Sequence, residues 1–187
     1  MRRIILASES PRRREILANA NINFTTKSIP TEETIDPTLP LGDAIAQIAL
    51  KKALAVQHLV PQDVILGADT IVCIDGEILG KPHTNENAAI MLRKLSGKTH
   101  QVITGVAIVK EQKYDVFYEV SDVTFFPLSE EDIQSYINTK EPLDKAGGYA
   151  IQGKGAIFVA KINGDYYNIV GLPIARVYRK LKDYIKD

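Results

Sequence analysis

The sequence predicts an α/β fold in which helices flank a mixed central sheet. In the first half of the chain, short apolar runs alternate with segments of helical spacing, a pattern typical of parallel strands joined by helices. In the middle, two long stretches rich in β-branched and aromatic residues follow each other directly, which favours antiparallel strands. With 187 residues, 45% of them hydrophobic, the chain can bury a core of its own. We therefore expect a single domain over residues 1–187.

The first half is expected to contain strand and helix in alternation. Ile16, Leu17 and Ala20 share one face of the first helix, which Pro11 opens, and Pro61 ends the second helix. The expected elements are a strand at 4–7, a helix over 11–20, an extended stretch at 24–29, a helix over 43–59 and a buried strand over 64–74.

The second half is expected to hold longer strands and shorter helices. The pair Asp75-Gly76 is a strong hairpin signal, and Ser129 followed by acidic residues is typical of a capped helix start. The expected elements are a hairpin strand at 77–79, a helix over 85–95, strands over 101–109 and 114–126, a helix over 129–138, a glycine-rich loop over 147–155, a strand over 157–162 and a helix from Pro173.

Composition excludes several classes of function. The 23 basic residues balance 23 acidic ones, so no overall field would hold a nucleic-acid polymer. A single cysteine, Cys73, can form neither an intramolecular disulfide nor a zinc cluster, and it indicates a reducing compartment. The apolar run near the N-terminus is too short for a signal peptide or a membrane span. We expect a soluble cytoplasmic protein without a membrane partner, in which any phosphate chemistry is local.

The segment Ser8-Glu9-Ser10-Pro11-Arg12-Arg13-Arg14 predicts an anion site. A serine cap and a proline at the first helical position expose backbone N–H groups at this helix start. Three arginines there oppose the helix dipole, and a bound polyanion would reverse that penalty. Spacing to the apolar face favours Arg12 and Arg13 over Arg14 as the inward-facing pair. The alternative is a solvated basic turn paired with neighbouring glutamates.

Asp69, in Gly67-Ala68-Asp69-Thr70, is the candidate catalytic residue. A carboxylate within an apolar strand is unfavourable unless it is paired or binds a metal, and the two small residues before it leave room for something to approach. The alternative is a strand-end aspartate that caps a loop.

Three further charged residues are candidates with weaker signals. Lys52 falls inside the apolar stripe of its helix, where it needs an anionic partner or must extend to solvent. Lys81 follows the hairpin and could equally lie in a solvated turn. Glu33 could add a second oxygen ligand to a cation at Asp69, or belong to a merely charged loop. The three histidines lack metal-ligand spacing.

Ordered motifs along nearly the whole chain resemble the Maf family of nucleoside triphosphate pyrophosphatases. The motifs are Leu6-Ala7-Ser8, Ser10-Pro11-Arg12-Arg13, Lys52-Ala53, Gly67-Ala68-Asp69-Thr70, Gly80-Lys81-Pro82, Leu95-Ser96-Gly97, His100 to Gly105, Glu141-Pro142, Asp144-Lys145-Ala146-Gly147, Ile151-Gln152-Gly153 and Val170-Gly171-Leu172-Pro173. One departure is Gly147-Gly148-Tyr149-Ala150, where the family more often reads Gly-Ala-Tyr-Gly.

The resemblance implies an elongated sheet akin to that of the inosine triphosphate pyrophosphatases, with a substrate cleft between two lobes. It also implies hydrolysis of dTTP and UTP, or modified pyrimidine nucleotides, to the monophosphate and pyrophosphate, which keeps such nucleotides out of nucleic acids. Asp69 would be the proton acceptor, and Arg12, Thr70 and Gln152 would select the substrate. Ser8, Arg13, Lys52 and Lys81 are expected to bind it.

A divalent cation, Mg²⁺ or Mn²⁺, is expected as cofactor, with Glu33 and Asp69 as ligands. A homodimer is implied by the resemblance, and the strand edges at 114–126 could pair across its two-fold axis. The alternative function is a nucleotide-binding regulator of cell division or septum formation that does not turn over its ligand. Such a protein would need the cationic groups but has no use for a buried Asp69.

Overall fold

The computed structural model describes residues 3–185 and divides into two compact units. Within the described residues, unit 1 comprises residues 3–69, 104–119 and 171–185, and unit 2 comprises residues 70–103 and 120–170. Three of the four boundaries lie inside strands, after Asp69, Ile103 and Glu119. This explains why the sequence contains no linker that marks the division.

The strands form a mixed sheet, as expected from the sequence. Within residues 3–185 it has seven strands in the order β2-β1-β3-β5-β6-β7, with β4 paired to β3. β1 pairs parallel with both β2 and β3, whereas β4 on β3 and β7 on β6 are antiparallel. The strands are β1 (Ile4–Leu6), β2 (Phe24–Thr26), β3 (Val64–Ile74), β4 (Glu77–Leu79), β5 (Thr99–Lys110), β6 (Lys113–Phe125) and β7 (Val159–Asn163).

The helices lie close to the predicted positions, with two additions. The helix Tyr166–Val170 was not predicted, and the expected glycine-rich loop contains short 3₁₀ turns. The α-helices are α1 (Pro11–Asn19), α2 (Leu41–Gln57), α3 (Asn85–Leu95), α4 (Glu130–Asn138), α5 (Tyr166–Val170) and α6 (Ile174–Ile185). The 3₁₀ helices are η1 (Glu141–Asp144), η2 (Ala146–Gly148) and η3 (Lys154–Phe158).

Two predictions about strands need correction. The expected strand at 157–162 begins only at Val159, because η3 runs through Phe158. The second half of β6 is not an exposed edge, because β7 pairs with it along Asp122–Phe125. The expected hairpin is confirmed, and Asp75 and Gly76 both have the positive φ of a primed turn.

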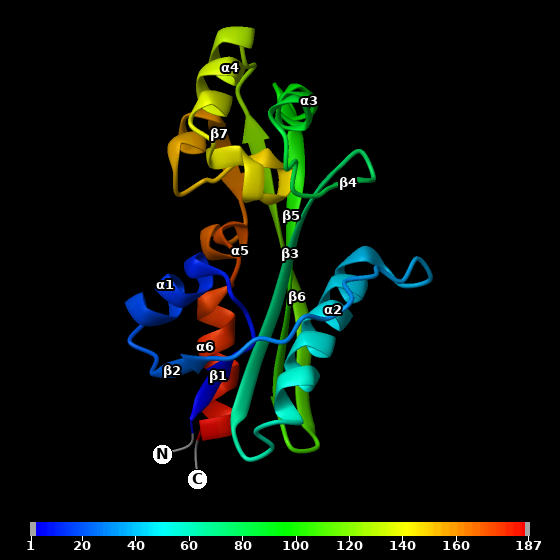
Figure 1. The fold of residues 1–187 in the computed structure, drawn as a ribbon, viewed down its shortest axis with the longest axis vertical. Helices are drawn as coiled ribbons and strands as arrows, with labels where there is room; N and C mark the ends of the chain where they lie inside the picture. The colour runs from blue at the N-terminus through cyan, green and yellow to red at the C-terminus, as the bar shows by residue number, and fades with distance from the viewer. Residues whose placement is uncertain (1–2, 186–187) are drawn as a thin grey trace. The chain divides into compact units, whose positions relative to one another are not determined.

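In unit 1, α2 packs tightly against the sheet. Its small residues Ala49 and Ala53 lie in one buried cluster with Ile5 and Ile65 of the parallel strands. α1 and α6 lie on the other side of these strands (Figure 1). The contact with α2 is close at Gly67, where a Cβ would stand 2.3 Å from the carbonyl oxygen of Ala49. Only glycine permits this approach of helix to strand.

Unit 2 has its own core. Val72 of β3, Leu92 of α3, Phe125 of β6 and Tyr136 of α4 belong to one buried cluster. α4 starts with a full capping box, in which Ser129 and Asp132 exchange hydrogen bonds. Across residues 3–185, no helix is both long and apolar enough to cross a membrane.

Candidate active site

Three charged side chains meet in unit 1. The Nζ atom of Lys52 lies 2.6 Å from Oδ1 of Asp69 and 2.6 Å from Oε1 of Glu33. The Lys52 and Asp69 side chains are only 15% and 14% exposed, whereas Glu33 is 60% exposed. The structure therefore brings Lys52 to the two carboxylates that the sequence had already linked as expected ligands of one cation, and neither lysine nor aspartate lies unpaired in its apolar element.

The close contact between α2 and β3 explains this arrangement. Gly67 lets the backbone of Ala49 approach the strand, and Lys52 follows Ala49 by three residues on the same helix face. Asp69 follows Gly67 by two residues and so lies on the same face of β3. The small residues before Asp69 suggested that some group approaches the strand there. That group is helix α2, which places Lys52 beside Asp69.

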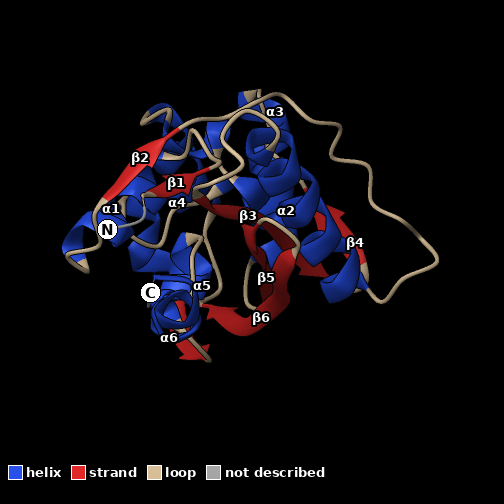
Figure 2. Cartoon of the chain, turned by 90° about the horizontal axis from the view of Figure 1, so that it is seen from below, coloured by secondary structure: helices blue, strands red, loops and turns tan. Residues whose placement is uncertain are grey.

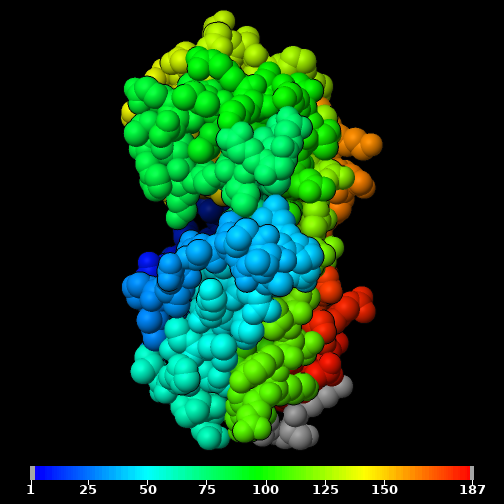
Figure 3. All heavy atoms as spheres, turned by 90° about the vertical axis from the view of Figure 1, so that its right-hand side faces the viewer, coloured from blue at the N-terminus to red at the C-terminus, as the bar shows by residue number. Residues whose placement is uncertain are grey.

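Glu33 reaches the cluster from a long connection without regular secondary structure. Residues 27–40 link β2 to α2, drawn as a tan loop in Figure 2, and most of them are exposed. Figure 3 shows this segment as light-blue spheres on the surface of unit 1. Because Glu33 sits on an exposed loop and Asp69 on a buried strand, the Glu33 carboxylate is much more accessible to solvent than that of Asp69.

The start of α1 is held by a network around Ser8 and Arg13. The Ser10 side chain caps the helix by accepting from the backbone N–H of Arg13. The buried guanidinium of Arg13 donates through Nε to the carbonyl oxygen of Gly171, at 2.8 Å, and through Nη1 to Oγ of Ser8, at 3.0 Å. Arg13 thus joins the first helix to the segment that precedes α6.

The charge of Arg13 also interacts with the carboxylates that surround Lys52. Burial lowers the pKa of Arg13, while the negative charges of Asp69 and Glu33 raise it and the positive charge of Arg12 lowers it further. Arg13 therefore lies within the electrostatic range of both carboxylates.

The predicted orientation of the arginines is confirmed. Arg13 is 9% exposed and Arg12 is half-buried, whereas Arg14 is exposed and donates to the backbone oxygen of Glu9. The alternative of a solvated basic turn is wrong for Arg13, because its guanidinium is buried and donates to a buried carbonyl and to a serine hydroxyl.

The other predicted residues belong to unit 2. Thr70 follows Asp69 in β3 and is half-buried. Lys81 is exposed, after the β4 hairpin, and Gln152 is exposed in the turn between Ala150 and η3.

No sequence pattern assigned a role to Glu141, although hydrogen bonds tie its carboxylate to the loop that carries Gln152. The only sequence signal was the presence of Glu141-Pro142 among the ordered motifs.

The carboxylates of Glu33 and Asp69 are suitable ligands for a divalent cation that also binds the phosphates of a substrate. In the described part of the chain, no three His, Cys, Asp or Glu side chains are grouped so as to hold a metal ion by themselves. Two carboxylates near one ammonium nevertheless match Mg²⁺, which usually takes one or two carboxylates and completes its shell with water and substrate phosphates.

Comparison with known families decides the relationship. The family model described as Maf-like protein matches residues 3–184. The chain belongs to the Maf family. This membership confirms the resemblance seen in the sequence motifs, and the match includes every candidate site residue named above.

Curated Maf relatives are similar over almost their whole length. A protein of Bacillus velezensis named dTTP/UTP pyrophosphatase is 52% identical, with 98% of this chain and 97% of the relative covered. One of Bacillus mycoides with the same name is 54% identical, with 100% and 98% covered.

A solved structure of a Mycobacterium abscessus protein, titled nucleoside-triphosphatase or dITP/XTP pyrophosphatase, covers 99% of the Maf chain and 100% of its own. It shares 14% identity at a TM-score of 0.44, which is too low to support an argument.

Proposed function

We propose that this Maf protein hydrolyses dTTP and UTP to the nucleoside monophosphate and pyrophosphate. The observation that carries the proposal is the cluster of Lys52 with Asp69 and Glu33, two carboxylates around one ammonium within the electrostatic range of Arg13. Relatives that share more than half of its residues over nearly the full chain are named for this activity. A regulator without turnover is not favoured, since binding alone does not require Asp69.

The triphosphate is held by cationic and hydroxyl groups. Arg12, Arg13, Lys52 and Lys81 supply positive charge that neutralises the phosphates and the charge developing in the transition state. The Ser8 oxygen accepts from the Ser10 N–H and from Arg13, and in this proposal the Ser8 O–H donates to a phosphate oxygen. Besides supplying charge, Arg13 holds Ser8 in position through its Nη1 donor.

Asp69 is the proton acceptor in this proposal. Its carboxylate takes the proton of the water that attacks the α-phosphorus, and pyrophosphate leaves as the α–β anhydride bond breaks. Lys52 holds Asp69 in position through their ion pair. A divalent cation held by Asp69 and Glu33 would supply Lewis-acid stabilisation of the phosphate oxygens.

Base selection belongs to Gln152 and Thr70 in unit 2. The Gln152 amide offers both a donor and an acceptor to a pyrimidine edge, and Thr70 adds a hydroxyl. A site that pairs such groups disfavours bases that leave them unpaired. The exposed position of Gln152 is consistent with contact to a ligand rather than with a packing role.

We further propose a cytoplasmic enzyme that removes pyrimidine nucleotides, modified ones included, before they enter nucleic acids, and that acts as a homodimer. Cys73 is buried and free, as a reducing compartment would allow.

Pyrophosphate release from a panel of nucleoside triphosphates tests the function. The purified chain should release pyrophosphate from dTTP and UTP with Mg²⁺ or Mn²⁺, and EDTA should abolish release. Purine triphosphates should react at least about tenfold more slowly in kcat/KM. Equal turnover of purines and pyrimidines would contradict the substrate assignment, and absence of turnover with every nucleotide would contradict the activity.

A further inference from the structure

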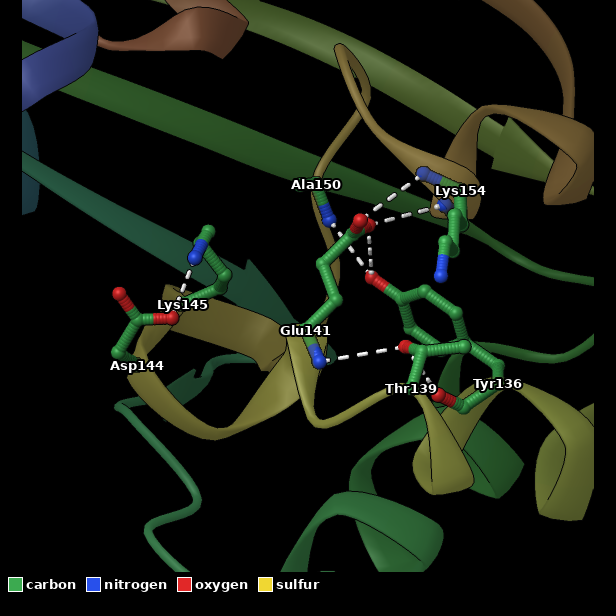
Figure 4. Close-up of polar contacts among 8 residues, drawn as sticks. Tyr136, Thr139, Glu141, Asp144, Lys145, Ala150 and Lys154 are labelled. Carbon is green, nitrogen blue, oxygen red and sulfur yellow. Dashed lines mark hydrogen bonds and ion pairs between the residues drawn. The ribbon is translucent and has the colours of Figure 1, made fainter.

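Glu141 lies at the centre of a hydrogen-bond network in unit 2 (Figure 4). It begins η1, directly after a turn in which Lys140 has positive φ. Its Oε1 accepts from the hydroxyl of Tyr136, at 2.8 Å, and the Tyr136 side chain is anchored in the core of this unit. The carboxylate is therefore held on one side by a buried, rigid ring from α4.

The same carboxylate binds the far end of the loop that carries Gln152. The backbone N–H of Lys154 donates to Oε2, at 3.1 Å, and the backbone N–H of Gly155 donates to Oε1, at 3.2 Å. These two amides open η3, so the negative charge also suits the positive end of this short turn.

The near end of the loop is held through Tyr136. The backbone N–H of Ala150 donates to the Tyr136 hydroxyl, at 3.1 Å, while that hydroxyl donates to Glu141. Figure 4 shows both connections as dashed lines that meet at the Tyr136 hydroxyl. The residues between Ala150 and Lys154, Gln152 among them, are thus held at one end by the Tyr136 hydroxyl and at the other by the Glu141 carboxylate to which it is bonded.

The fit between loop and carboxylate is close. A Cβ on Gly153 would stand 2.5 Å from either oxygen of Glu141, and a Cβ on Gly155 would stand 2.9 Å from the Tyr136 hydroxyl. Glycine at these two positions lets the loop backbone approach the network directly. The loop is therefore shaped around Glu141 rather than merely adjacent to it.

Electrostatics agree with an ionised Glu141. Burial raises the pKa of Glu141, but hydrogen bonds from the Lys154 N–H, the Tyr136 hydroxyl and the Gly155 N–H outweigh burial, so the pKa lies below its ordinary value. Charge-assisted hydrogen bonds of this type are stronger than neutral ones and resist loop motion.

We propose that Glu141, acting with Tyr136, is a positioning residue for substrate selection: it fixes the backbone around Gln152 so that the amide meets the pyrimidine base in one orientation. This inference rests on the role given to Gln152 in the proposed function. Pre-organisation matters here because discrimination between bases depends on hydrogen bonds whose geometry a mobile loop would not hold.

The test is a double-mutant cycle that follows base selectivity. Glu141→Gln replaces one acceptor oxygen with an NH₂ group, which must face a backbone N–H or the tyrosine hydroxyl. We expect the ratio of kcat/KM for dTTP to that for dGTP to fall at least about fivefold, through a lower kcat/KM for dTTP. In a Gln152→Ala background, the same substitution should change the ratio less than about twofold.

A second variant and a second measurement guard against simple misfolding. Tyr136→Phe keeps the ring in the core but removes the hydroxyl, and it should lower the selectivity ratio in the same direction. Amide hydrogen exchange should accelerate at Lys154 and Gly155 in Glu141→Gln, with the Leu92 amide of α3 unchanged. The matched control is Glu131→Gln, which alters an exposed glutamate of α4. It should leave both selectivity and amide exchange unchanged.

The outcomes separate this inference from the proposed function. If the wild type is selective and Gln152→Ala loses selectivity while Glu141→Gln keeps it, the positioning role is overturned and the function stands. If Gln152→Ala keeps selectivity, the inference falls together with the role of Gln152. If no nucleotide is hydrolysed by the wild type, the proposed function fails, yet unaltered exchange at Lys154 and Gly155 would still overturn the role of Glu141.

Discussion

Lys52 of α2 and Asp69 of β3 form an ion pair, with Nζ 2.6 Å from Oδ1, in which both side chains are largely shielded from solvent. The same ammonium bridges to Glu33. Lys52 thus occupies the position between two carboxylates that a divalent cation would also favour. The single positive charge of the lysine offsets part of the charge of the two carboxylates, which leads to distinct expectations for each partner.

Asp69→Asn should abolish most activity while the fold persists. The substitution keeps size and removes both the proton acceptor and one charge, so we expect kcat to fall by about 10²-fold or more with a much smaller change in KM. Steady-state pyrophosphate release measures this. Asp63→Asn, which removes the ion-pair partner of Arg3 away from the Lys52 cluster, is the control and should keep normal kcat. A kcat for Asp69→Asn within about twofold of wild type would remove Asp69 from the mechanism.

Lys52→Met should strengthen metal binding in the absence of nucleotide. Without the ammonium, the Glu33 and Asp69 carboxylates lose their neutralising partner, so a cation between them becomes more favourable. We expect Mn²⁺ affinity, measured by calorimetry, to rise at least about threefold while kcat/KM for dTTP falls. Lys51→Met, on the exposed neighbouring position, should change neither. Unchanged Mn²⁺ affinity in Lys52→Met would argue against a metal at these carboxylates.

Arg13→Met should destabilise the chain, unlike Arg14→Met. Removal of the Arg13 guanidinium leaves the carbonyl of Gly171, in a buried segment, without this donor, for which we expect a loss of about 1–3 kcal/mol in the free energy of unfolding. Arg14 is exposed, so its loss should stay within about 0.5 kcal/mol. Urea denaturation monitored by circular dichroism compares the two. Equal stability of both variants would contradict a structural role for Arg13.

Stability should decline between about pH 6.5 and pH 4 because of His100. Burial lowers the pKa of His100 to about 4 from the ordinary 6.5, its Nε2 lies 2.8 Å from the Tyr149 hydroxyl, and its ring packs edge-on against Phe125. In this window the unfolded chain binds the proton and the folded chain does not, so stability is lost as pH falls, by at most about 1.4 kcal/mol per pH unit.

His100→Gln removes this titration and keeps a polar side chain. The difference between urea midpoints at pH 7 and pH 5 should be smaller in His100→Gln than in wild type. An equal difference in both proteins would show that other groups dominate the acid sensitivity.

Local sequence patterns were sufficient to predict most helices and strands and to identify the charged residues of the candidate site. Apolar periodicity and hairpin chemistry placed α3 at its observed bounds and β4 behind the turn at Asp75 and Gly76, because these features depend on neighbours within a few residues. The buried setting of Asp69 also followed from sequence, since a carboxylate in an apolar strand needs a partner. The short helix α5 escaped prediction because five residues carry too little periodicity.

The family, the mixed sheet and the charged groups could all be predicted from the sequence, because propensity, pattern and ordered motifs are local properties. Which of these groups contact one another depends on the packing of the folded chain. The partner of Asp69 depends on the approach of α2 at Gly67, and the partner of Arg13 lies 158 residues away at Gly171. The role of Glu141 depends on a loop that closes onto its carboxylate. Such pairings arise from packing between distant segments, which no local pattern encodes.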